Sequence, residues 1–277
     1  MKKIKTLFYL LTFFAIFSCS DTKVIENLPA DTEDAEPVPG YFQKNVLIED
    51  YTGTWCGNCT RVAYAIDQVH LQTDKVVTVA IHNGNDPYHF ENFMPLKDLI
   101  MPDSPALELP QSRLNRTITW LSPEPSNIQQ AKGLTGNNSG LGLAISSSIS
   151  NGMVNVEVNM KFVQNYSGLK LVVYLLEDHL IRNQVNYTSY YGNVNPVPNY
   201  EHNHVLRLNL TDLLGDPITE NTTAGQQITK SFSIPVPSNI SNPDNISFAA
   251  FIVQADNLSL NARHADLNEN QTYQQNQ

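Results

Sequence analysis

The order of apolar and polar positions divides the chain into two halves with different repeats. In the first half, apolar runs at 46–48 and 75–81 flank a segment in which Val62, Ile66 and Val69 recur every three to four positions. That repeat is typical of a helix with one buried face, and a nearly continuous apolar run is typical of a buried strand. The pattern predicts strand, helix, strand, which is a βαβ unit. A second helix is predicted over 124–132.

From about residue 140 the repeat changes to two, the period of a half-buried strand. Two alternating runs flank Asn151-Gly152, a strong hairpin signal. Strands are predicted at 141–149, 154–162, 169–177, 203–210, 227–234, 246–254 and 257–264. Seven short strands separated by turn signals favour an immunoglobulin-like sandwich. The tyrosine- and asparagine-rich segment 186–200 either binds a partner or packs under the first half, since such residues are typical of recognition loops.

Two cysteines, Cys56 and Cys59, stand between the first predicted strand and the first predicted helix. A C-x-x-C pair in this context is typical of a thioredoxin-like redox site. Unpaired N–H groups and the helix dipole stabilise a thiolate there, so we expect Cys56 to be accessible and to ionise below the ~8.5 of a free thiol. Cys59 lies one turn on, where it can close a disulfide and release a mixed-disulfide partner. The alternative is a static disulfide that holds the turn to the helix.

The motif resembles that of the thioredoxin family, and the resemblance implies roles for two further residues. In that family, an acidic residue six positions before the first cysteine lies buried behind the disulfide and moves a proton to the second cysteine. The resemblance implies this role for Asp50. The alternative is that Asp50 caps the loop or faces water. The family's lysine on the next strand is replaced, with Ile81 at the aligned position. The family's cis-proline, which positions a bound peptide, is best matched by Pro110, with Pro102 and Pro105 as competitors.

The first residues have the features of an export signal. Residues 1–18 combine a lysine-rich start with an apolar stretch too short to span a bilayer, which needs about 20 residues. The end of the stretch resembles a bacterial lipobox, and the resemblance implies cleavage before Cys19 and its acylation, which anchors the chain to a membrane. An ordinary cleaved signal is the alternative. Ser20, in place of an aspartate that retains lipoproteins at the inner membrane, favours the outer membrane.

The predicted organisation is an α/β thioredoxin-like domain followed by an all-β immunoglobulin-like sandwich. A signal peptide (1–18) and an acidic, proline-containing tether (19–41) precede the thioredoxin-like domain (42–136). The sandwich (138–265) precedes a polar tail (266–277), which we expect to be disordered because it lacks apolar periodicity. At 41% hydrophobic residues the chain can bury sizeable cores.

Charge and the remaining histidines exclude some classes of partner. The net charge of −10 becomes −13 once three signal lysines are removed, leaving 14 basic and 27 acidic residues, which argues against nucleic acid and against anionic lipid headgroups. His202 and His204 alternate on one predicted strand, but no third ligand with suitable spacing is visible, so no metal site is predicted. No cofactor is expected beyond a redox-active Cys56–Cys59 disulfide.

Several motifs together resemble those of the outer-membrane-protein-twenty-eight family of surface lipoproteins. They are the lipobox, the run from Asp50 to Cys59, the run Tyr200-Glu-His-Asn-His-Val-Leu-Arg207, and Ala249-Ala-Phe-Ile-Val-Gln with Leu260-Asn-Ala. The resemblance covers about 45 to 265 and implies a thioredoxin-like domain, a trailing β-domain and an outer-membrane location. The function expected first is thiol–disulfide exchange on exported or surface proteins. The rival is a non-catalytic surface binding protein or adhesin with a structural disulfide, and a periplasmic chaperone is a third reading.

Overall fold

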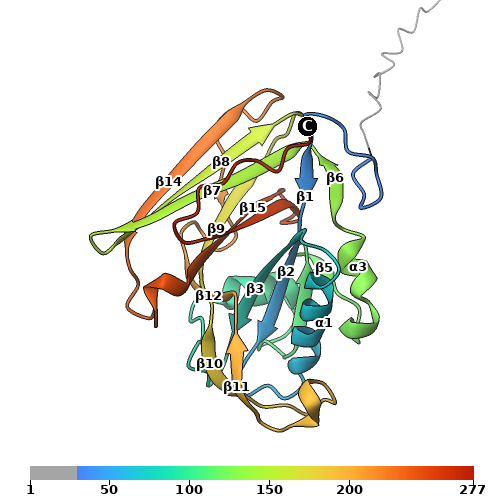
Figure 1. The fold of residues 1–277 in the computed structure, drawn as a ribbon, viewed down its shortest axis with the longest axis vertical. Coiled ribbons are helices and arrows are strands. Elements are labelled where there is room, and N and C mark those ends of the chain that lie inside the picture. Colours follow the sequence, from blue (N-terminus) through green and yellow to red (C-terminus); the bar gives the residue numbers. More distant parts are fainter. Residues whose placement is uncertain (1–29) are drawn as a thin grey trace, which may run out of the picture.

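The computed structural model describes residues 30–277. The predicted signal peptide, the lipid site at Cys19 and most of the tether lie outside the described residues. Within them, no helix is both long and apolar enough to cross a membrane. The fold is rich in sheet and has few helices (Figure 1).

One mixed sheet forms the centre of the molecule. Its strands are, in spatial order, β16 (Ser259–Asp266), β15 (Ile246–Val253), β9 (Lys170–Glu177), β12 (Val205–Asn209), β3 (Val76–His82), β2 (Val46–Thr52), β4 (Gln111–Leu114) and β5 (Ile118–Thr119), with β13 (Asp216–Pro217) paired to β9. Strands β2, β3 and β12 run parallel, and the other pairs are antiparallel. Strands from both halves of the sequence therefore share one hydrogen-bonded sheet.

The first half contains the predicted βαβ unit. Helix α1 (Thr60–His70) connects the parallel strands β2 and β3 and buries the predicted apolar positions Val62, Ile66 and Val69. The predicted helix 124–132 is divided into a short 3₁₀ helix, η1 (Glu124–Ser126), and α3 (Ile128–Lys132), because Asn127 leaves the helical conformation at φ −125°. Helix α1 and α3 pack with β2 around a core that includes Trp120.

The other face of β2 and β3 is covered by the segment that follows β3. Helix α2 (Met94–Ile100) buries Leu96 in a core shared with Val77, Val79 and Ile81 of β3. Phe90 from the preceding loop joins the same core. The segment 83–105 is therefore a packed helical decoration on the sheet face opposite α1.

A second, three-stranded sheet packs on β9 and β15. It contains β14 (Gln227–Pro235), β8 (Met153–Phe162) and β7 (Leu141–Ser150), seen at the upper left of Figure 1. Alternate residues of β9 enter two different cores: Leu171, Val173 and Leu175 meet the three-stranded sheet, and Val172, Tyr174 and Leu176 meet the core under α2. Burial on both faces explains why β9 is apolar along its length. All seven strands predicted from the period of two have counterparts.

Two short pairs complete the sheets. The hairpin of β10 (Leu180–Gln184) and β11 (Val197–His202) extends from the lower end of the molecule in Figure 1, and β1 (Phe42–Lys44) pairs with β6 (Gly136–Ser139). A boundary near residue 137 does not divide the central sheet, because Val205 of β12 pairs with Ala80 of β3. Periodicity predicts where strands lie but not which strands pair, so the prediction of two domains contained no pairing between their strands.

The polar tail is ordered, which corrects the prediction for 266–277. Backbone N–H groups of Gln43 and Asn276 donate to the carbonyls of Gln274 and Tyr41, at 2.9 and 2.8 Å. The ring of Tyr273 lies 5.8 Å from that of Phe42. Asparagine and glutamine side chains hold the tail through hydrogen bonds, and such contacts have no apolar periodicity that could reveal them in the sequence. Residues 30–36 are also docked, since Asn138 donates to the carbonyls of Ala30 and Glu36.

Candidate functional site

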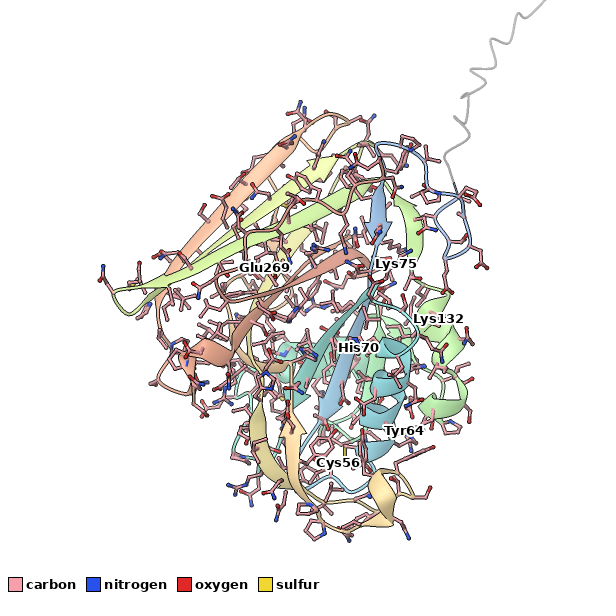
Figure 2. The ribbon with its side chains drawn as sticks, viewed as in Figure 1. Cys56, Tyr64, His70, Lys75, Lys132 and Glu269 are labelled. Carbon is pink, nitrogen blue, oxygen red and sulfur yellow. A yellow bond between two sulfur atoms is a disulfide. The ribbon has the colours of Figure 1, made fainter. Side chains whose placement is uncertain are left out.

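Cys56 and Cys59 form a disulfide at the start of α1. Their Cα atoms are 5.4 Å apart, and Cys59 is the residue that caps the helix. Figure 2 shows Cys56 at the lower end of α1, with Tyr64 and His70 further along the same helix. The first turn of α1 has no acidic residue, so a thiolate here would feel the positive end of the helix dipole without a competing charge from that turn.

Asp50 is buried close to the disulfide. It is 5% exposed on β2, and it and Cys59 line the same cavity of about 130 Å³. Its Oδ1 atom has no hydrogen-bond partner within residues 30–277. Burial raises the pKa of Asp50 well above its usual value, and the negative charge of Glu124 raises it further. A raised pKa favours the protonated carboxyl group, which is the form that can donate a proton.

The residue opposite Asp50 on β3 is Ala80, not Ile81. The parallel register pairs Asp50 with Ala80, and both line the cavity, whereas Ile81 points into the core under α2. The predicted alignment was therefore one residue off, because adjacent strand residues face opposite sides of a sheet. The predicted absence of a lysine at this position holds, since Ala80 is apolar.

Pro110 immediately precedes β4, and the Leu109–Pro110 bond is cis. The antiparallel register pairs Gln111 with Tyr51 and Ser112 with Asp50. Pro110 therefore stands at the end of a strand that neighbours the strand of Asp50. The bonds before its competitors, Pro102 and Pro105, are not cis.

His82 and Asp86 hold the turn that carries the cysteines, and sequence reasoning missed both. Asp86 accepts a hydrogen bond from the backbone N–H of Thr54 and lies 3.1 Å from His82 Nδ1. Burial alone would raise the pKa of Asp86, but the hydrogen bond and charge of His82 lower it to about 2. The available signal was the position of His82 at the carboxyl end of a buried parallel strand, next to the end of β2.

The segment 185–196, which we call the tyrosine loop, lies directly on the cysteine turn. Its backbone N–H groups at Val185 and Tyr187 donate to the carbonyls of Thr54 and Gly57, at 2.9 and 2.8 Å. The Tyr187 ring lies so close to Gly57 that a Cβ atom there would stand 2.3 Å from the ring. Of the two alternatives for this segment, the structure shows packing against the first half.

The tyrosine loop is also attached to α1. Asn186 Oδ1 accepts a hydrogen bond from Thr60 Oγ1 at 2.8 Å. Tyr190 stacks on Tyr64 with ring centroids 4.3 Å apart, and the Tyr191 hydroxyl donates to Asp67 at 2.7 Å. These contacts hold the loop over the start of the helix.

Burial by this loop changes the prediction for Cys56. The residue is 5% exposed and Cys59 is 1% exposed, so the leading sulfur is covered in this conformation and the expectation of an accessible Cys56 is not met. The cover comes from the tyrosine loop, an irregular segment about 130 residues after the cysteine pair. Its hydrogen bonds to the cysteine turn leave no periodic pattern in the sequence.

Several histidines line the cavity behind the disulfide. It lies between α1 and the β10–β11 hairpin and includes His70, His82, His202 and His204. Burial, with the nearby charge of His82, lowers the pKa of His202 to about 3. Burial and two neighbouring histidines lower the pKa of His70 to about 4. The imidazoles of His202 and His70 are therefore neutral at pH 7. His202 and His204, predicted on one strand face, take different neighbours: the ring of His202 lies 5.3 Å from that of His82, and His204 faces Asp178.

Comparison with known proteins supports the fold and identifies the family. HBP35 of Porphyromonas gingivalis is similar in structure over 84% of this chain and 78% of its own, with 18% identity and a TM-score of 0.61. A domain of the outer membrane lipoprotein Omp28 from the same organism aligns over 48% of this chain and 100% of its own, with 15% identity and a TM-score of 0.31. No curated protein sequence matches significantly. The model of the family "Outer membrane protein Omp28" matches residues 106–271. Because that match covers more than half of the chain, the protein belongs to the Omp28 family, and its location is the outer membrane, as the sequence predicted.

Proposed function

We propose that the protein performs thiol–disulfide exchange on exported or surface proteins through Cys56 and Cys59. In this proposal β2, α1, β3 and β4 act as a thioredoxin-like unit, and the trailing strands act as an immunoglobulin-like sandwich. The supporting observation is that Asp50, with its raised pKa, and Cys59 line one cavity beside a disulfide at a helix start. The lipid at Cys19 would attach the protein to the membrane, and Pro110 would position the client backbone.

The exchange needs only the Cys56–Cys59 pair, Asp50 and a client with two thiols. A client thiolate attacks Sγ of Cys56, the Cys56–Cys59 bond breaks, and Cys59 leaves as a thiolate that takes a proton from Asp50. The client's second thiolate attacks the client sulfur of the mixed disulfide and releases Cys56 as a thiolate. The client loses two electrons and the Cys56–Cys59 pair gains them. The reverse sequence, with Cys56 as the attacking thiolate, reduces a client disulfide.

The tyrosine loop must move for either direction, because Cys56 is 5% exposed while the loop is in place. Several of its contacts with the cysteine turn are hydrogen bonds to backbone carbonyls, which a client chain could replace. Tyr187 is itself 70% exposed, so its release from Gly57 would uncover little additional apolar surface. We propose that clients reach the disulfide by displacing this loop.

A structural disulfide is the second candidate, and the same low exposure favours it. The family match begins at residue 106 and does not include the cysteine pair, so family membership lends no support to exchange. In this alternative, the protein is a surface binding protein or adhesin in which Cys56–Cys59 fastens the turn to α1.

Two measurements on the purified protein separate these functions. The first is the equilibrium potential of the Cys56–Cys59 couple against glutathione, where a value far below about −300 mV indicates a structural bond. The second compares Cys59→Ser with the double variant Cys56→Ser/Cys59→Ser after incubation with exported proteins. Exchange predicts mixed disulfides with the single variant that are absent from the double variant and dissolve on reduction. A low potential together with no trapped client would refute exchange and leave the structural alternative.

A further inference from the structure

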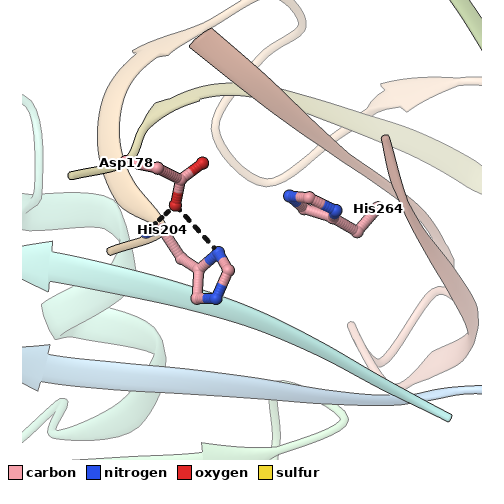
Figure 3. Close-up of side chains that lie close together, drawn as sticks. All are labelled: Asp178, His204 and His264. Carbon is pink, nitrogen blue, oxygen red and sulfur yellow. Dashed lines mark hydrogen bonds and ion pairs between the residues drawn. The ribbon is translucent and has the colours of Figure 1, made fainter. Parts of the chain in front are cut away.

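Three potential metal ligands from three different parts of the central sheet lie close together (Figure 3). Asp178 directly follows β9, His204 directly precedes β12, and His264 lies on β16. Each side chain offers one ligand atom, and these atoms lie within 4.8 Å of one another. The sequence predicted no metal site because the second and third ligands are far from His204 along the chain.

Hydrogen bonds and an ion pair hold the carboxylate but leave one imidazole nitrogen without a partner. Asp178 Oδ1 accepts from the backbone N–H of His204 at 2.6 Å, and Asp178 Oδ2 accepts from Ser247 Oγ. His204 Nδ1 lies 3.1 Å from Asp178 Oδ1 in an ion pair, whereas His264 Nε2 is buried without a partner within residues 30–277. Buried polar atoms without partners are costly, and a ligand is one explanation for retaining them.

The spacing is close to that of a metal centre. Ligand atoms about 2.0–2.1 Å from a tetrahedral Zn²⁺ ion stand roughly 3.4 Å from each other. The His204–Asp178 pair at 3.1 Å already fits this spacing. The most distant pair, at no more than 4.8 Å, must close by about 1.4 Å. Rotation of the two imidazole rings can supply this movement because both side chains are only partly buried.

The contacts around the cluster also suit a metal. Ser247 orients the Asp178 carboxylate from behind, which is the role of outer partners at metal sites. His70, whose ring lies 6.1 Å from that of His204, stands next to the cluster.

We propose that Asp178, His204 and His264 bind a divalent transition-metal ion of the zinc class, with a fourth position open to water or a ligand. Two imidazoles and one carboxylate suit Zn²⁺ and related ions, whereas Ca²⁺ and Mg²⁺ prefer sites made of oxygen ligands. His204 also lines the cavity that holds Cys59 and Asp50. This cavity gives an ion a route to His204. The site does not depend on redox activity of the cysteine pair.

The test is Zn²⁺ binding by the purified full chain after treatment with a chelator. The Cys56→Ser/Cys59→Ser background is used so that free thiols cannot bind the metal. Isothermal titration calorimetry should show one Zn²⁺ per chain, and Ca²⁺ and Mg²⁺ should not compete. His264→Gln and Asp178→Asn should each weaken binding by on the order of 100-fold, since loss of outer partners alone costs 10- to 100-fold.

His179→Ala is the matched control. His179 is adjacent to Asp178 but exposed, and it pairs with Glu201 at 2.7 Å instead of joining the cluster. Its variant should bind Zn²⁺ as the parent does. Circular dichroism of each variant shows whether the fold is kept, and Co²⁺ absorption bands in the parent report imidazole coordination without any substitution. No Zn²⁺ binding by the parent, or unchanged binding by folded His264→Gln, would overturn the proposal.

Discussion

The pH dependence of stability in Asp50→Asn tests the proposed proton carrier directly. Asp50 is buried, and its pKa is raised well above the value of the unfolded chain. The folded protein therefore holds this proton at a pH where the unfolded chain has released it. Because the unfolded state binds fewer protons in this interval, the free energy of unfolding falls as pH rises from the unfolded pKa to the folded pKa. Asparagine has no charge to bury and does not lose stability in this way.

The magnitude follows from the size of the pKa shift. Each pKa unit corresponds to about 1.4 kcal/mol of unfolding free energy. Because the pKa of Asp50 is raised well above its usual value, the stability of Asp50→Asn relative to the wild type should be greater at pH 8 than at pH 4, by more than about 1 kcal/mol. The buried amide of asparagine adds a cost that does not change with pH, and the comparison of two pH values removes it.

Urea unfolding followed by tryptophan fluorescence measures this difference, since Trp120 is buried in the core beside α1. Glu91→Gln, the same type of change on an exposed residue, serves as the control for effects of pH on the rest of the chain. If the relative stability of Asp50→Asn is the same at pH 4 and pH 8, Asp50 is not a buried, uncompensated carboxyl group. Its assignment as proton carrier would then fail.

Three other changes test the loop, the core and the tail. Asn186→Ala removes the hydrogen bonds of a buried loop side chain to Thr60, Tyr190 and Val194, so dithiothreitol should reduce Cys56–Cys59 about 5- to 30-fold faster. An unchanged rate of reduction would show that the tyrosine loop does not control access to the disulfide. Phe251→Ala empties a fully buried position beside Tyr174 and should lower the free energy of unfolding by about 3–5 kcal/mol, whereas Leu71→Ala, at a site 78% exposed, should lower it far less. Similar losses for both variants would contradict the assigned core. Deletion of 270–277 removes the hydrogen bonds of Gln274 and Asn276 and should cost about 2 kcal/mol in urea unfolding, whereas a disordered tail would cost nothing.

Local signals in the sequence predicted local structure well. The spacing of Val62, Ile66 and Val69 predicted the helix α1 and its buried face, and alternation around Asn151-Gly152 predicted β7 and β8. Each of these features depends on residues close together in the chain, where period and turn chemistry act directly.

Contacts between distant segments were not predictable in the same way. The pairing of β3 with β12 depends on backbone hydrogen bonds, which any sequence can make. The cover over Cys56 depends on the backbone of the tyrosine loop and on the absence of a side chain at Gly57. The ring of His264 lies 5.4 Å from that of His204, although β15 and β9 stand between β16 and β12 in the order of the sheet. None of these contacts leaves a repeat that a single sequence reveals.

The parallel pairing of β3 with β12 limits how this protein can be taken apart. A fragment that ends near residue 137 would present the β3 edge to solvent, and a fragment that begins there would present the β12 edge, each with unpaired backbone groups that invite aggregation. The segment with the cysteine pair is therefore not an independent cassette that evolution or a protein engineer could move to another scaffold unchanged. Any transplant of the cysteine chemistry would have to carry β12 and its neighbour β9 with it.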